Sequence, residues 1–118
     1  MKEHSRDSAL LLARTLEDKR GLDILLLDVS HMTVITDYFL ICSGRSMLNV
    51  RTMAEELERI AFEAAGLRPL RRDGAQEARW IVLDYNSVIV HIFLESEREF
   101  YHLERLWMDG SNSVDFRG

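Results

Sequence analysis

Apolar residues recur at helical spacing in two long segments of the chain. The first segment predicts a helix from Arg6 to Lys19 that ends before Gly21, because glycine commonly follows the last turn of a helix. The second predicts a helix from Met47 to Ala65, which Gly66 ends in the same way. The apolar stripe of this second helix consists of Val50, Met53, Ala54, Leu57, Ile60, Ala61 and Ala64. We expect both stripes to pack against a sheet.

Two runs between these helices are apolar at consecutive positions. The runs are Asp23–Val29 and Asp37–Ser43, and the loop 30–36 joins them. A strand with this pattern is buried on both faces, so we expect both strands to be central in their sheet. The second run passes directly into Ser-Gly-Arg-Ser at 43–46, which predicts a tight turn into the second helix.

The region after the second helix predicts a short arm and then a β-hairpin. Residues 67–74 contain Pro69, which has no N–H for a strand ladder, so we expect an extended arm or an edge strand there. Residues 79–93 predict a hairpin with Asn86 and Ser87 at its turn.

A helix and a polar tail complete the chain. Residues 96–107 predict one helix, in which Ser96 and Glu99 have the spacing of a capping box. Residues 111–118 are polar without periodicity, and we expect a flexible tail. The order of elements predicts an α/β fold, a small sandwich built on a mixed sheet, with residues 1–110 forming one domain.

The predicted hairpin has two unlike faces. One face carries only apolar or aromatic residues, which are Ile81, Leu83, Tyr85, Val88, Val90 and Ile92. The other face is mixed and carries Trp80, Val82, Asp84, Ile89, His91 and Phe93. Either a helix covers this mixed face, in which case its polar side chains need buried partners, or the face is open to a partner protein.

Composition and charge describe an ordinary globular chain with an acidic balance. Of the 118 residues, 47% are hydrophobic and 30% are charged, and the formal net charge is −5. No run approaches the roughly 18 apolar residues of a membrane helix, and we expect no secretory signal. The single cysteine, Cys42, indicates a reducing compartment, so we expect a cytoplasmic protein. The negative charge is unsuited to sequence-specific nucleic-acid binding and favours a basic protein partner.

The sequence offers only weak support for a catalytic site or a metal site. Cys42, His91 and Asp84 could be drawn as a triad, but a cysteine ending an apolar strand is usually a core residue. The four histidines are scattered and a second cysteine is missing, so we expect no metal site. A more serious alternative is a nucleotidyltransferase that uses the turn at Gly44. Its paired carboxylates are missing, because the residue two positions after Asp84 is the neutral Asn86.

Five stretches together resemble the ribosomal silencing factor family, the Iojap-like proteins. The stretches are "DILLLDVS" from Asp23, "TDYFLICSGRS" from Thr36, "RWIVLDY" from Arg79, "VIVHIFLESEREFYHLERLW" from Val88, and Asp109. The resemblance covers Leu10 to Asp109, almost the whole chain. It includes Asp37 and Tyr38, which could serve either the fold or a contact.

The resemblance implies a nucleotidyltransferase-like fold without the catalytic carboxylates, no enzymatic activity and no cofactor. It implies a translation repressor that binds the large ribosomal subunit through ribosomal protein fourteen and sterically blocks the joining of the small and large subunits.

On the same resemblance, the docking surface is the mixed hairpin face, with Trp80 as its anchor. The residues expected to bind the ribosomal protein are Trp80, Val82, Asp84, His91, Phe93 and Glu95. Two other readings stay open, which are a nucleotide-binding enzyme that uses the Gly44 turn and a homodimer that pairs through the exposed hairpin face.

Overall fold

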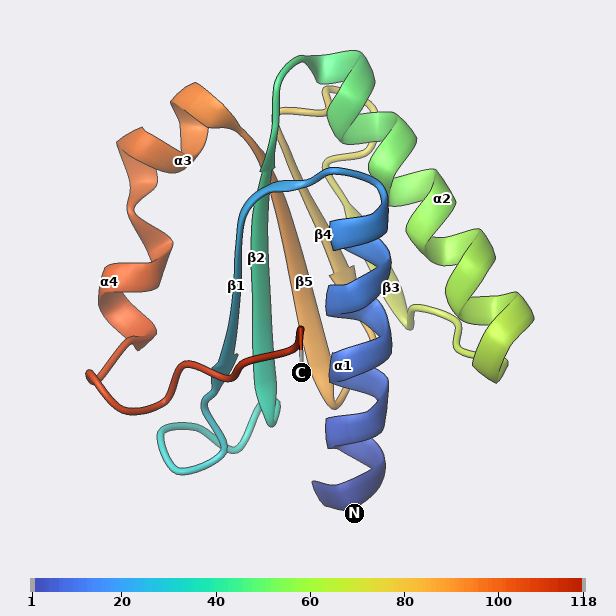
Figure 1. Ribbon diagram of the computed structural model, residues 1–118. Helices are drawn as coiled ribbons and strands as arrows, with labels where there is room; N and C mark the ends of the chain where they lie inside the picture. The colour runs from blue at the N-terminus through green and yellow to red at the C-terminus, as the bar shows by residue number, and fades with distance from the viewer. Residues whose placement is uncertain (1, 118) are drawn as a thin grey trace.

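The computed structural model describes residues 2–117 of the chain. The protein is a five-stranded mixed sheet with helices on both faces (Figure 1). The helices are α1 (Lys2–Asp18), α2 (Met47–Ala65), α3 (Glu95–Tyr101) and α4 (Leu103–Trp107). The strands are β1 (Leu22–Asp28), β2 (Tyr38–Gly44), β3 (Arg71–Asp73), β4 (Trp80–Asp84) and β5 (Val88–Leu94). The predicted α/β fold with a mixed sheet is confirmed. Among the described residues, no helix is both long enough and apolar enough to pass through a bilayer.

The strands lie in the order β1-β2-β5-β4-β3, with β2 and β5 parallel and the other neighbours antiparallel. The prediction that β2 is central is confirmed, and every one of its residues is buried. The prediction that β1 is central is wrong, because β1 lies at one edge of the sheet. Its apolar pattern has another cause, since helices cover both of its faces. The predicted edge strand in the arm is β3.

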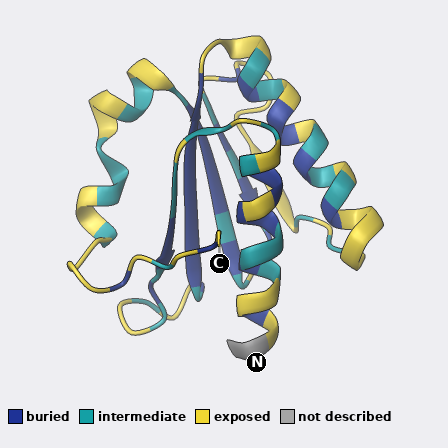
Figure 2. Ribbon diagram, in the orientation of Figure 1, coloured by how far each residue is buried: buried dark blue, intermediate teal, exposed yellow. Residues whose placement is uncertain are grey.

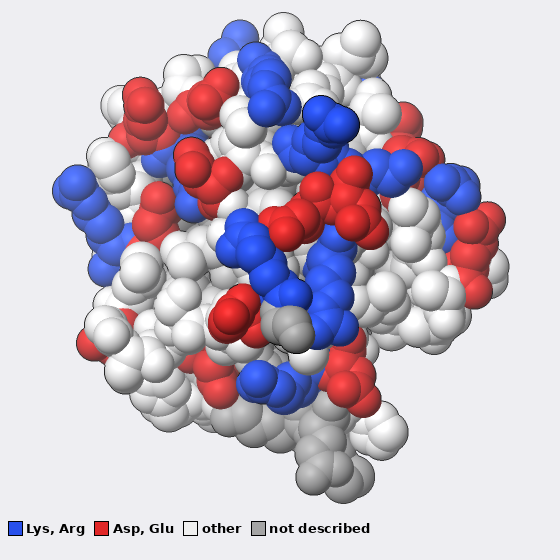
Figure 3. Space-filling model, viewed as in Figure 1, with Lys and Arg blue, Asp and Glu red and all other residues white. Residues whose placement is uncertain are grey.

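Helices α1 and α2 cover one face of strands β1, β2, β5 and β4. The apolar face of the hairpin packs beneath them, and the strands are the most buried part of the molecule (Figure 2). The predicted core residues Ile81, Leu83, Tyr85, Val88, Val90 and Ile92 are all buried. The side of the molecule seen in the view of Figure 1 mixes basic and acidic side chains over its surface (Figure 3). That mixture gives this side no single sign of charge.

The C-terminal segment packs along the free edge of β1, which corrects the prediction of a flexible tail. Ser113 forms an antiparallel bridge with Leu27, and Val114 N donates to Leu26 O at 2.8 Å. Phe116 is 2% exposed and belongs to the main core. The segment escaped prediction because a single apolar anchor and backbone hydrogen bonds hold it, and neither produces periodicity.

The last helical region also differs from prediction. One helix was expected from Ser96, whereas the structure has two short helices that meet at His102, where φ is 48°. The expected capping box is wrong, because the N-cap of α3 is Leu94 and it makes no side-chain cap bond. The break turns the chain, so that α3 and α4 follow different directions over the second face of the sheet (Figure 1).

Candidate docking surface

The second face of the sheet is only half covered. Helix α3 packs on β2 and β5, while Leu103 and Trp107 of α4 pack on a cluster that includes Leu27 and Phe39. Strand β4 lies beyond these helices, and its burial alternates along the strand. Its outward residues are half-buried, and directly paired residues on β3 and β5 extend the same surface. We call this the open sheet surface, and it consists of Trp80, Val82, Asp84, Ile89, Arg71 and Asp73.

Trp80 is held firmly within the open sheet surface. Its ring stacks on Phe93, with centroids 4.7 Å apart and planes at 27°, and its centroid lies 4.9 Å from that of Tyr101. Its indole Nε1–H donates to Nδ1 of His91 at 3.1 Å. The sequence therefore places a large aromatic ring, fixed on several sides, at the border between covered and open sheet.

Two of the predicted contact residues lie too deep to touch a partner. Phe93 is completely buried and His91 is 8% exposed, because α3 and α4 cover this part of the face. Burial lowers the pKa of His91 to about 4, so its imidazole is neutral at pH 7. The expectation that His91 and Phe93 extend the contact surface is corrected, since both lie beneath Trp80 and support it.

Asp84 combines a half-buried carboxylate with a role in the hairpin turn. Its Oδ1 accepts from the backbone N of Asn86 at 2.8 Å, as in an Asx turn. Asn86 has a φ of 73°, the left-handed conformation that asparagine tolerates. The predicted turn and register are confirmed, since Asp84 pairs with Ile89 and Tyr85 N donates to Val88 O. Asp84 stays half-buried and so can still face a cation.

Sequence reasoning missed two exposed aromatic side chains on α3, of which Tyr101 lies beside Trp80 and Phe100 lies beside Tyr101. Phe100 is 77% exposed and Tyr101 is 49% exposed, and their ring centroids lie 5.0 Å apart. A continuous helix would place Phe100 on the packing side with Leu103 and Trp107. The break at His102 removes that alignment. The residue type gives only a slight signal, because histidine is moderately enriched at positive φ.

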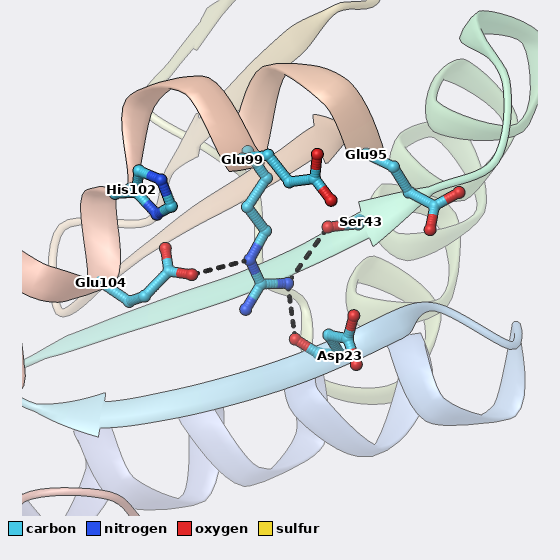
Figure 4. Close-up of a pocket in the computed structure, with 7 residues that line it drawn as sticks. Asp23, Ser43, Glu95, Glu99, His102 and Glu104 are labelled. Carbon is cyan, nitrogen blue, oxygen red and sulfur yellow. Dashed lines mark hydrogen bonds and ion pairs between the residues drawn. The ribbon is translucent and has the colours of Figure 1, made fainter.

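Glu95, the last predicted contact residue, lines a hollow between α3, α4 and the strands (Figure 4). The hollow is lined by Asp23, Ser43, Glu95, Arg98, Glu99, His102 and Glu104. At its centre the guanidinium of Arg98 donates to Asp23 O at 2.6 Å and to Ser43 Oγ at 3.1 Å. Its Nε also donates to Glu104 Oε1 at 3.3 Å. Through these hydrogen bonds, Arg98 connects α3 to α4 and to the sheet.

Cys42 and the turn at Gly44 serve packing. Burial raises the pKa of the Cys42 thiol to about 12, and its neighbours are core residues under the first helical layer. His91 pairs with Ile41 and lies on the opposite face, so the two side chains do not meet. A Cβ at Gly44 would lie 2.8 Å from Val50 Cγ2, so a larger residue there would force the packing against α2 to shift. Ser46 caps α2 by accepting from Asn49 N.

Metal-binding groups of three or more histidine, cysteine or acidic residues are absent from the described part of the chain. The arrangement on the second face suits recognition of another macromolecule, because it combines exposed aromatic rings with acidic side chains on a rigid sheet.

Comparisons with known proteins agree with the sequence resemblance. The profile of a family described as "Ribosomal silencing factor during starvation" matches residues 2–117. The ribosomal silencing factor RsfS of Bacillus subtilis is 41% identical over 99 residues, which cover 84% of this chain and 83% of that protein. The protein of the same name from Halalkalibacterium halodurans is 37% identical over 108 residues, which cover 92% of this chain and 91% of that protein.

A solved structure shares the fold. The crystal structure of a Chromobacterium violaceum protein superposes with a TM-score of 0.82 at 28% identity, covering 93% of this chain and 92% of that one. The profile match spans nearly the whole chain, and the relatives are similar over most of their own length. This chain belongs to the ribosomal silencing factor family.

Proposed function

We propose that this protein represses translation by binding the large ribosomal subunit through ribosomal protein fourteen, so that the small subunit can no longer join. The observation that carries the proposal is the open sheet surface with Trp80 at its border with the covered part of the sheet, in a chain of the ribosomal silencing factor family. The mode of action is steric, and the protein itself performs no chemistry.

Aromatic residues supply the anchor of the proposed interface. Tryptophan is enriched among interface hot spots because it offers a large contact area with few rotatable bonds. Trp80 is already fixed by Phe93 and Tyr101, so its docking costs little conformational entropy. The exposed rings of Phe100 and Tyr101 extend the apolar centre beyond the residues expected from the sequence.

Acidic residues supply the charge complement to a basic ribosomal protein. Asp84 and Asp73 lie on the open sheet surface, and Asp84 can pair with a lysine or arginine of the partner. The net charge of −5 favours encounter with a basic surface. Glu95, at the start of α3, contributes charge at the rim.

We also infer that the fold is a nucleotidyltransferase-like one that has lost its chemistry. Gly44 is needed for close packing against α2, and one oxygen of Asp84 is engaged in the hairpin turn. These structural roles account for Gly44 and Asp84, the two residues that suggested a nucleotidyltransferase.

The proposal is tested by sedimentation with isolated ribosomal subunits and by a subunit-joining assay. The unaltered protein should sediment with the large subunit alone, and added protein should reduce the fraction of joined ribosomes. Trp80→Ala should weaken binding by about 2 kcal/mol or more, roughly 30-fold, because the anchor is lost.

The matched control is Phe62→Ala, which removes another partly exposed aromatic ring, on α2 at the opposite side of the molecule. It should bind as the unaltered protein does. Joining that proceeds unchanged at saturating protein would rule out the proposed function. If a folded Trp80→Ala variant bound the large subunit as tightly as the unaltered protein, the interface would have to lie on another surface.

A further inference from the structure

A buried histidine lies directly beneath the proposed anchor. The imidazole of His91 contacts Phe39 edge-on at 5.3 Å, and its ring plane is 16° from that of Phe93 at 6.2 Å. Aromatic rings thus surround it, and the side chain is almost inaccessible to solvent. A polar ring in such a place loses its hydration, so its hydrogen bonds decide whether it is tolerated.

The imidazole of His91 is hydrogen-bonded to Trp80. Nδ1 of His91 accepts the indole N–H at 3.1 Å, whereas Nε2 is buried without a hydrogen-bond partner among the described residues. An accepting Nδ1 in a neutral imidazole requires the proton to be on Nε2. Phenylalanine would fill similar space without leaving a buried N–H unpaired. Packing alone therefore does not account for a histidine, whereas an acceptor for Trp80 does.

We propose that His91 is a positioning residue that fixes the indole of Trp80 in its docking orientation before the partner arrives. His91 itself does not touch the partner. The hydrogen bond sets the rotation of the indole about its own side-chain bonds, while Phe93 and Tyr101 restrict it from two other sides. A fixed anchor binds more tightly because less freedom is lost on docking. The inference rests on the proposed function, in which Trp80 is the anchor.

The first test examines the free, full-length protein by proton–nitrogen NMR. The chain contains two tryptophans, Trp80 and Trp107, and Trp80→Phe assigns the two indole N–H signals. The Trp80 indole proton should be protected from solvent exchange, and the His91 spectrum should show a protonated Nε2 and an unprotonated Nδ1. His91→Phe should speed indole exchange by about tenfold, which corresponds to a hydrogen bond of about 1.4 kcal/mol.

The second test adds the conservative variant and a binding measurement. In His91→Asn the side-chain oxygen can lie near the former Nδ1 position, so indole protection should largely return. Binding to the large ribosomal subunit should fall roughly three- to tenfold in His91→Phe and recover in His91→Asn. This order of the two variants separates an acceptor from simple space-filling, which asparagine serves less well than phenylalanine.

The outcomes are distinct for the two proposals. If the unaltered protein does not bind the subunit, the proposed function fails, and the exchange rates still decide whether His91 fixes Trp80. Equal indole exchange in the unaltered protein and His91→Phe would overturn the positioning role. Weaker binding by His91→Asn than by His91→Phe would also overturn it. If His91→Phe does not fold, a proton on Nδ1 in the unaltered protein would overturn the role by itself.

Discussion

Single residues of the characteristic sequence motif serve the fold through specific contacts. Tyr38 is 1% exposed and lies in the main core, and Asp37 accepts a hydrogen bond from Ser5 Oγ at 2.7 Å. That bond ties the start of β2 to α1. Gly44 and Ser46 form the tight connection into α2. The motif therefore builds the scaffold, while the proposed docking residues come from β4 and α3.

His91 should make the stability of the domain depend on pH. Its folded pKa of about 4 lies below the ordinary value of 6.5, so the unfolded chain binds more protons between these pH values. Stability should therefore fall as the pH falls from about 6.5 towards 4. The contribution is on the order of 3 kcal/mol at most.

Urea unfolding of the unaltered protein and of His91→Phe at pH 7 and pH 4.5 measures this contribution. The loss between the two pH values should be smaller in the variant, because phenylalanine cannot be protonated. The same loss in both proteins would mean that other groups account for the acid sensitivity.

At the scale of elements, the short helices α3 and α4 depend on polar contacts as well as on their apolar side. Neither helix contains a fully buried residue. Arg98, by contrast, has a side chain that is only 11% exposed and joins α3 to β1, β2 and α4. Because α3 also carries Tyr101 beside Trp80, the hydrogen bonds of Arg98 also hold part of the proposed docking surface in place.

Arg98→Ala should destabilise the domain by about 2 kcal/mol, because it leaves the Glu104 carboxylate and a backbone carbonyl without their donor. Amide hydrogen exchange should accelerate over residues 95–107 more than over α2. The matched control is Arg79→Ala, which breaks an exposed ion pair to Glu97 on the same helix and should cost less than about 1 kcal/mol. If the two substitutions destabilised the domain equally, Arg98 would not be the residue that holds α3 and α4 in place.

The sequence predicted those elements whose signal lies in local periodicity or turn chemistry. The bounds of α2, its glycine cap and the hairpin register followed from a 3.6-residue stripe and from Asn86 at the turn. The break at His102 and the edge position of β1 depend on tertiary contacts, which leave no local pattern. The candidate site was predicted in part for the same reason. Alternation placed Trp80 and His91 on one face but could not tell which of them the helices cover.

At the scale of the whole molecule, the two ends of the chain are joined through the core. Phe116 packs with residues of α1, Arg14 Nε donates to Phe116 O at 2.7 Å, and Arg117 pairs with Glu17 at 2.8 Å. The C-terminal segment therefore packs both against α1 and along the edge of β1.

Phe116→Ala should lower the free energy of unfolding by about 3 kcal/mol, because a buried aromatic ring is removed from the core. Chemical denaturation measures the change, and Phe62→Ala, whose ring is 45% exposed, is the control. A loss below about 0.5 kcal/mol would indicate that the segment contributes little to the folded domain.

The paired edge of β1 also limits how the protein can aggregate. A sheet whose edge strand is free offers backbone groups to another chain, and this is a common start of fibre formation. Here the C-terminal segment occupies part of one edge, and the strand at the other edge has only three residues. Strand addition is therefore unfavourable at both ends. A self-associated form would have to use side chains, and the exposed aromatic rings around Trp80 are the natural place. Such a form would use the surface that is proposed to bind the ribosomal partner, so the two associations would compete.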